Sequence, residues 1–258
     1  MNLKRTLALS AALLAMTPAA EAQIQTVNRS LDAPAAGHVV ITLVDGDVTV
    51  RGWDSPTIEI SGQLGAGAQE LEVGQQRNET RIRVIERPDD VAAGDVETEL
   101  FVSVPAGSSL AIDGTNTDLL VANVRGTLSL HTVSGDIEAE FFGATVTAET
   151  VGGDIRVSAR DAAGEATLTT VAGEIEAGGP FRTITASTVS GDIELDVLDA
   201  AMLSLNSTNG DIEVHATFDG AAELTAETIN GDVELRVGEE GNLNLDAGTF
   251  SGRIDICF

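Results

Sequence analysis

Hydrophobic and polar residues alternate along most of the chain in short runs that end at turn residues. One such run, Leu128 to His131, is followed by the turn Val133 to Asp136 and then by a second run that begins at Ile137. A period of two is typical of a half-buried β-strand, and a Gly next to an Asp is typical of a tight turn. After residue 22, no stretch combines the 3.6-residue period with the capping residues of a helix. The pattern predicts an all-β protein.

This unit of strand, turn and strand repeats along the C-terminal part of the chain. A glycine marks each copy, within segments such as Val-Ser-Gly-Asp-Ile-Glu, and successive glycines are separated by 18, 20, 18, 19, 21 and 21 residues. A weaker copy at Asn116 to Val121 precedes them, so we expect about eight units. The structural turn glycines are Gly135, Gly153, Gly173, Gly191, Gly210, Gly231 and Gly252.

Aligning the units produces columns of like residues. The second residue after each glycine is β-branched and apolar, the fifth and seventh before it are apolar, and the third before it is Thr or Ser. Matching residues in every unit are expected when strands stack parallel and in register. We therefore predict a single-chain parallel β-solenoid, or β-helix, with coils of about 19 residues. The competing arrangement is a meander of antiparallel hairpins turning at Gly-Asp, which gains nothing from identical columns.

The first part of the chain lacks a clean period. Strand-like runs cover residues 39–44, 48–53, 57–60, 81–85, 99–104 and 110–112, with loops expected at 65–69 and 88–94. The first coil of a solenoid would otherwise leave an open edge. We therefore expect residues 39–112 to form an N-terminal β region that caps the β-solenoid repeats of residues 113–258.

The N-terminus has the order of a secretory signal peptide. Basic Lys4 and Arg5 are followed by the apolar run from Leu7 to Met16 and by small residues up to Ala22. We predict a signal peptide over residues 1–22 and a linker over residues 23–38. About ten apolar residues are too few to span a bilayer, which needs about 20, and no later segment is longer. We expect an exported protein without a transmembrane span, either periplasmic or extracellular at the cell surface.

Composition removes several classes of function. Asp and Glu number 41 against 14 Lys and Arg, a formal net charge of −27, so nucleic acid is not an expected partner. Lys4 is the only lysine, which excludes lysine chemistry once residues 1–22 are removed. Cys257 is the only cysteine, so no intrachain disulfide is possible. The sequence contains no zinc, phosphate-loop or serine-hydrolase motif, and we expect no cofactor.

The repeats also place acidic residues in columns one and three positions after the glycines. Carboxylates stacked at about 4.8 Å repel by roughly 0.9 kcal/mol per pair in water. One explanation is a solvated acidic face whose Asp carboxylates also accept N–H bonds at the turns. The other is Ca²⁺ bridging adjacent coils, although the nine-residue repeat of calcium-loaded solenoids is absent. The candidate metal ligands are Asp192, Glu194, Asp211, Glu213, Asp232 and Glu234.

Two sequence features together resemble a known family. They are the segment Glu99 to Ile112, which contains Val-Pro-Ala-Gly, and the repeated Thr-Val-Ser-Gly-Asp-Ile-Glu. They resemble the bacterial putative-adhesin β-strand-repeat family, exported domains of unknown function, from about Val39 onward. The resemblance implies an exported β-solenoid-like domain and brings no catalytic residues with it. The last coil departs from the pattern with Arg253 in place of an acid.

Two functions from different classes fit these observations. The first is a non-catalytic, exported, adhesin-like scaffold of the cell envelope that presents an acidic repeat surface to an envelope protein or polysaccharide. It could also associate end to end through the last coil, where Ile254, Ile256 and Phe258 have no polar cap. The alternative is a polysaccharide hydrolase or lyase on a β-helix, since glycosidases use paired carboxylates. Short coils and the scarcity of aromatic residues favour the scaffold, which is not an enzyme.

Overall fold

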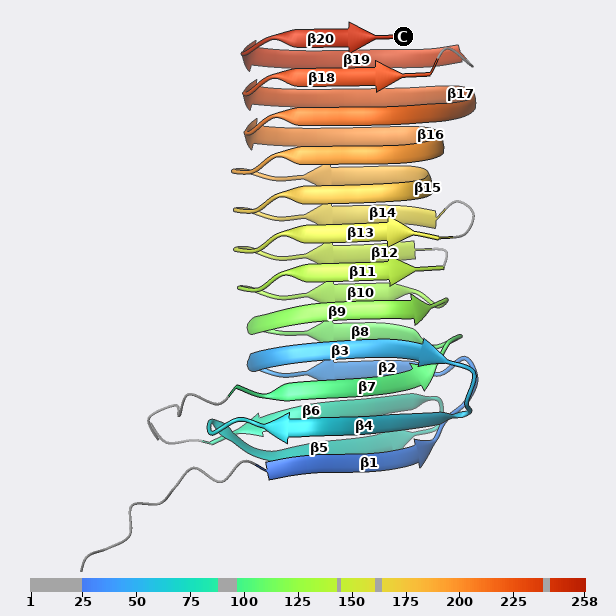
Figure 1. The fold of residues 1–258 in the computed structure, drawn as a ribbon, viewed down its shortest axis with the longest axis vertical. Coiled ribbons are helices and arrows are strands. Elements are labelled where there is room, and N and C mark those ends of the chain that lie inside the picture. Colours follow the sequence, from blue (N-terminus) through green and yellow to red (C-terminus); the bar gives the residue numbers. More distant parts are fainter. Residues whose placement is uncertain (1–24, 88–96, 143–144, 161–163, 239–241) are drawn as a thin grey trace, which may run out of the picture.

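The computed structural model describes residues 25–87, 97–142, 145–160, 164–238 and 242–258. They form a tall stack of coils with the C-terminal residues at one end (Figure 1). Within the described residues every regular element is a strand. Each repeat coil contributes one strand to each of two facing sheets and turns between them at its glycine. The predicted all-β solenoid is confirmed, and the pairing between coils is parallel, as between Ile137 and Ile155, which excludes the hairpin meander.

The two sheets differ in the side chains that they present outward. In spatial order, the first sheet contains β5 (Ala68–Gln76), β6 (Glu79–Glu86), β2 (His38–Thr42), β8 (Ser109–Asp113), β10 (Leu128–His131), β12 (Thr145–Glu149), β14 (Gly164–Thr169), the second halves of β15 (Ile175–Ser187), β16 (Ile193–Asn209) and β17 (Ile212–Asn230), and β19 (Asn242–Ser251). We call its outer surface the hydroxyl face, because Ser129, Thr147, Thr167, Thr185, Ser204 and Thr225 form one column on it.

The second sheet carries the acidic columns. It contains, in order, β1 (Gln25–Asp32), β4 (Thr57–Leu64), β7 (Glu99–Pro105), β3 (Asp45–Trp53), β9 (Asn116–Val124), β11 (Ile137–Phe141), β13 (Ile155–Ala159), the first halves of β15, β16 and β17, β18 (Val233–Val237) and β20 (Ile254–Cys257). We call its outer surface the acidic face.

The core is the layer between the two sheets. The aliphatic columns predicted from the repeat point into it, and the side chains of Ile155, Ile175 and Leu205 are fully buried there. Burying apolar surface at about 25 cal/mol per Å² in every coil is the main stabilising contribution to the stack. Because both strands of each coil bury alternate side chains, the intervening residues must point outward, and this fixes the composition of the two faces.

The N-terminal part does not stack in chain order. The coil formed by β2 and β3 lies between the coil of β6 and β7 and the coil of β8 and β9, because β2 pairs with both β6 and β8 and β3 with both β7 and β9. Strand β4 lies antiparallel to β7, β1 antiparallel to β4, and β5 antiparallel to β6. These three antiparallel strands occupy the end of the stack opposite the C-terminal residues (Figure 1).

The structure refines the N-terminal predictions. The six strand-like runs overlap β2, β3, β4, β6, β7 and β8, although β2 ends at Thr42, two residues before the predicted end of the first run. Residues 23–38, expected to be a linker, contain β1, and part of the loop expected at 65–69 belongs to β5. Both sheets continue without a break across the boundary placed at residues 112 and 113. The predicted signal peptide and the loop at 88–94 lie outside the described residues.

Candidate functional site

The corner of each repeat is a small hydrogen-bonded motif between two coils. From Thr150 onward, the hydroxyl three residues before the glycine donates to the carbonyl oxygen of the glycine in the preceding coil. Thr170 donates to Gly153 at 3.1 Å and Thr228 to Gly210 at 3.0 Å. The column of Thr and Ser residues three positions before the glycines, which we call the hydroxyl ladder, therefore makes coil-to-coil contacts. These bonds satisfy carbonyl groups at the bend.

The same carbonyl oxygens explain why the corner residue is glycine. A Cβ atom built on Gly210 would lie 2.0 Å from the carbonyl oxygen of Gly191, and one on Gly173 would lie 1.9 Å from that of Gly153. Close approach of two backbones is thus the common requirement, because only some of these glycines, such as Gly135, have a positive φ (141°).

The Asp column on the acidic face is part of this corner motif. One carboxylate oxygen, Oδ1, of each Asp accepts the backbone N–H of the corresponding residue in the next coil. Asp192 accepts from Asp211, and Asp211 from Asp232, both at 2.7 Å, while Asp154 accepts from Glu174 at 2.9 Å. Charge-assisted bonds of this kind are about twice as strong as neutral ones and offset the repulsion within the column. The Asp residues therefore have a structural role.

The Glu column lies beside the Asp column and is partly neutralised by arginines. Glu194, Glu213 and Glu234 are neighbours in register on β16, β17 and β18. Arg236 contacts Glu213 at 3.2 Å and also forms an ion pair with Glu234. At the end of the Asp column, Arg253 donates to Oδ2 of Asp232 at 2.7 Å, and its side-chain and backbone hydrogen bonds lower the pKa of that carboxyl group.

The structure thus places the six candidate metal ligands on three consecutive coils of one face. Three of them, Glu213, Glu234 and Asp232, have an arginine as their cationic partner. Within the described part of the chain, no group of three or more His, Cys, Asp or Glu side chains is arranged to hold a metal ion. Bridging of adjacent coils by Ca²⁺ stays the alternative to a solvated acidic face.

Nearer the N-terminus, the acidic face lacks this neutralisation. A shallow hollow of about 370 Å³ is lined by residues that include Asp47, Glu99, Asp118 and Asp136. Partial burial, and then repulsion by Asp118, raise the pKa of Asp47. Burial likewise raises the pKa of Glu174, further along the face, although Arg156 lies 3.8 Å from its carboxylate and acts in the opposite direction. Around Asp47, the neighbouring carboxylates therefore repel that group in the folded protein.

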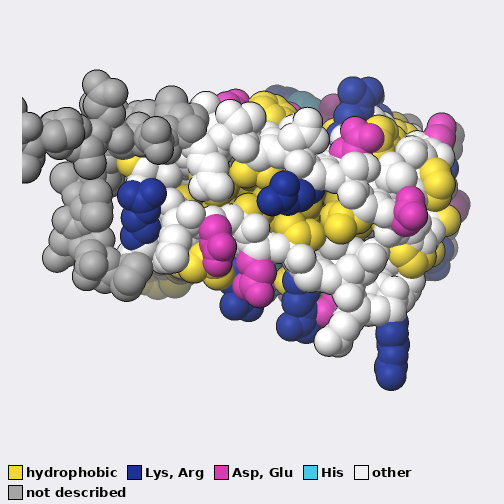
Figure 2. Space-filling view, turned by 90° about the horizontal axis from the view of Figure 1, so that it is seen from below, with side chains coloured by type: hydrophobic (Ala, Val, Ile, Leu, Met, Phe, Trp, Pro, Cys, Tyr) yellow, Lys and Arg dark blue, Asp and Glu magenta, His cyan; other side chains and the backbone are white. Residues whose placement is uncertain are grey.

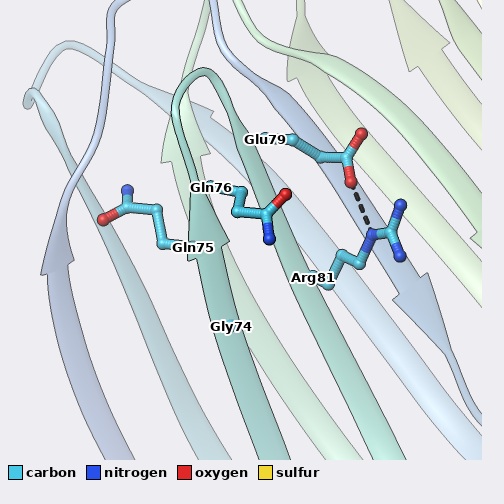
Figure 3. A pocket seen from close by; sticks show the side chains of 5 residues that line it. All are labelled: Gly74, Gln75, Gln76, Glu79 and Arg81. Carbon is cyan, nitrogen blue, oxygen red and sulfur yellow. Dashed lines mark hydrogen bonds and ion pairs between the residues drawn. The ribbon is translucent and has the colours of Figure 1, made fainter.

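The remaining hollows are shallow and lie on the outside of the coils. One of about 170 Å³ lies across the hairpin of β5 and β6, where Figure 3 shows the Glu79 carboxylate and the Arg81 guanidinium pointing toward each other beside Gln76. The largest described, of about 560 Å³, follows the corners of four coils from Val189 to Phe250. Neither brings together the pair of carboxylates that a glycosidase requires, whereas the hollow beside Asp47 and Glu99 does bring carboxylates together.

One constellation has the order of a hydrolase triad. On the hydroxyl face, His131 Nε2 lies 2.9 Å from Ser129 Oγ, and His131 Nδ1 lies 3.2 Å from Glu149 Oε2. A serine nucleophile also needs donors for an oxyanion and a pocket for the substrate. These three residues lie on adjacent strands of a flat sheet, and none of them lines a described hollow. The arrangement is a surface hydrogen-bond network.

Sequence reasoning missed an exposed apolar column. The residue two positions before each glycine points outward at the corner, and Val133, Val151, Val171, Val189 and Ile229 are 43–49% exposed, while Phe250 is 89% exposed. The signal was present in the aligned repeats, as a Val, Ile or Phe at that position in all but one. It was missed because a single apolar residue beside a turn does not reveal which way it points.

The fold and the corner motif can be compared with known proteins. A family model described as Toastrack DUF4097 matches residues 89–197 and 162–258. The chain belongs to the Toastrack DUF4097 family. The resemblance inferred from the repeats is thereby confirmed. None of the curated proteins compared with this Toastrack chain matches it.

Two solved structures resemble the Toastrack chain over most of its length. A putative adhesin from Bacteroides fragilis has a TM-score of 0.50 and 14% identity, over 90% of this chain and 97% of its own. A putative adhesin from Parabacteroides distasonis has a TM-score of 0.50 and 12% identity, with the same coverage. At these identities the likeness concerns the fold. Separately, the residues described here include no helix that is both long and apolar enough to cross a membrane.

Proposed function

We propose that this Toastrack chain is a non-catalytic, exported, adhesin-like scaffold of the cell envelope whose acidic face binds cationic groups of a partner. The observation that carries the proposal is the pair of in-register carboxylate columns on one flat face, exemplified by Glu194, Glu213 and Glu234. Successive strands lie about 4.8 Å apart, so the face offers evenly spaced negative charges to an extended envelope protein or polysaccharide.

The way in which the columns are built supports binding to a partner. The Asp carboxylates each use one oxygen for the fold, through bonds such as that from Asp211 N–H to Asp192, whereas Glu194 is exposed and bonded to no described group. The longer Glu side chains, which lie beside the hydrogen-bonded Asp column, can reach a ligand without disturbing the coil-to-coil bonds. Many weak contacts along one rod then add up to useful avidity.

The binding test uses synthetic cationic and anionic probes. We expect the chain from Gln23 onward to retain a ten-residue lysine peptide and not a ten-residue glutamate peptide, with binding that weakens as salt increases. Replacing Glu194, Glu213 and Glu234 together with Gln should weaken retention about tenfold.

A matched control variant separates the contribution of the acidic face to binding from that of the total charge of the protein. Replacing Glu70, Glu72 and Glu165 with Gln removes the same charge from exposed positions on β5 and β14, which belong to the sheet of the hydroxyl face. This variant should bind like the original chain. Equal weakening by both triple variants would mean that only total charge matters, and the proposed binding face would be abandoned.

Export is tested separately from binding. When the full chain is expressed in a Gram-negative host, we expect to find it outside the cytoplasm with the mass of a chain that begins at Gln23. Replacing Ala22 with Arg should leave the N-terminal segment uncleaved. A chain that stays in the cytoplasm at full length would refute the envelope location, whatever its binding properties.

A further inference from the structure

The two ends of the stack are built differently. At the N-terminal end, the edge strands β1 and β5 carry exposed charged residues, including Arg29, Glu70 and Glu72. Figure 2, which looks onto this end, shows basic and acidic side chains scattered among apolar and polar ones. Charged side chains on an edge strand discourage pairing with another sheet. This end is therefore protected.

The last coil lacks this protection. Among the described residues, β19 pairs only with β17, and β20 only with β18, so both strands have one unpaired edge. Ile254 and Ile256 are 41% and 39% exposed, although the corresponding residues of earlier coils are buried. Phe258 is 74% exposed. Within the described residues, the core layer is thus exposed at this end, beside two rows of backbone donors and acceptors.

The charged residues of the last coil indicate which partner fits its exposed edge. The acidic columns of two stacked copies would repel each other, but the last coil ends the Asp column with Arg253, whose side chain is 80% exposed. Asp255 ends the Glu column two residues further on. When two copies of β20 pair antiparallel about Ile254, Arg253 of one copy lies directly opposite Asp255 of the other, within reach of its side chain.

We propose that the last coil binds the last coil of a second copy of this chain, as a two-fold dimer in which both sheets continue antiparallel across the junction. A two-fold contact uses the same patch on both copies and closes on itself, so the protected N-terminal ends point outward and no filament forms. Ile254 and Ile256 become buried, and two pairs of Arg253 with Asp255 join the acidic faces. This inference is independent of the proposed binding function.

The test measures association by sedimentation equilibrium with the chain from Gln23 onward, in the presence of a reductant so that Cys257 cannot cross-link. We expect a reversible dimer. R253E should raise its Kd at least about tenfold, because both junction pairs become repulsive. R253E combined with D255R restores opposite charges and should return the Kd to within about threefold of the original. R125E makes the same charge change at an exposed turn far from the junction and should leave the Kd unchanged.

Other outcomes overturn the proposal. They are a monomer at all concentrations, a dimer that R253E does not weaken, and a weakened dimer that the charge exchange does not restore. Because Arg253 also contacts Asp232 within the chain, folding of each variant is checked by circular dichroism. I256K gives a second test at a side chain that is already partly exposed, and it should abolish the dimer while leaving the spectrum intact. A dimer that persists in I256K would also refute the two-fold junction.

Discussion

Replacing Gly210 with Ala should destabilise the protein far more than the small size of a methyl group suggests. The added Cβ would lie 2.0 Å from the carbonyl oxygen of Gly191. Real contacts of this kind are longer than 3.0 Å, so the two coils must separate locally by about 1 Å. At that corner the coils are joined by the bonds from Gly191 N–H to Asn209 at 3.1 Å and from Asn209 N–H to Val189 at 3.0 Å.

The expected magnitude follows from those contacts. Lengthening either bond by about 1 Å breaks it, and each lost bond costs about 1 kcal/mol plus the penalty for a polar group left unpaired. The Ser207 hydroxyl, which donates to Gly191 at 3.2 Å, is weakened in the same movement. We therefore expect G210A to lower the free energy of unfolding by about 3–5 kcal/mol, as large as the removal of a core side chain.

The assay is urea denaturation followed by circular dichroism. The matched control is G248A, because a Cβ there would meet nothing closer than 4.0 Å, on the Glu227 side chain. This variant should change the free energy of unfolding by less than about 0.5 kcal/mol. If G210A costs no more than G248A, the close approach of the corner backbones is not what requires glycine.

Three further predictions concern the hydroxyl ladder, pH and cations. T228V should lower the free energy of unfolding by about 1–2 kcal/mol, because the preceding glycine carbonyl loses its donor, and T228S, which keeps the hydroxyl, should retain most of the stability in the same urea assay. The melting temperature should be higher at pH 5 than at pH 7.5 at constant ionic strength. The pKa values of Asp47, Glu86 and Glu174 are raised in the folded protein. Such carboxyl groups bind protons more tightly when the protein is folded, so stability increases as the pH falls toward the ordinary carboxyl pKa of about 4. The lowered pKa of Asp232 reduces stability only at a pH below about 4. Finally, CaCl₂ and NaCl at matched ionic strength should raise the melting temperature equally relative to EDTA, through screening of the acidic columns, and a rise specific to calcium would instead identify the Asp and Glu columns as cation sites.

The repeats allowed much of this fold to be predicted, because every coil places the same residue types in the same environment. The buried Ile column and the Thr ladder both follow from columns that only parallel stacking explains. The edge strands β1 and β5 gave no such signal. In β1 only Val27 and Leu31 are apolar and aliphatic, four residues apart, and in β5 the charged and amide residues outnumber Leu71 and Val73. Such edge strands are held by backbone pairing, which leaves little trace in the sequence.

The candidate site was predicted less completely, because its chemistry depends on distances between coils. The columns of Asp and Glu were visible in the sequence, but not the sharing of each Asp carboxylate with the next backbone N–H. Nor could the sequence show that Arg236 would lie between Glu213 and Glu234. Arg253 was visible in the aligned units as a departure from the Asp column, but its ion pair with Asp232 depends on the contact between two coils.

The insertion of the β2 and β3 coil between two later coils has a consequence for how the protein folds. In the repeats, each strand finds its neighbour one coil away, and the loop that must close is short. Strand β2, by contrast, pairs His38 with Ser109, across all of β3 to β7. Loop closure over such a distance costs more entropy and is slower. Assembly of the N-terminal coils should therefore be the rate-limiting step, after which the remaining coils add quickly onto a finished template, each stabilised mainly by its neighbour.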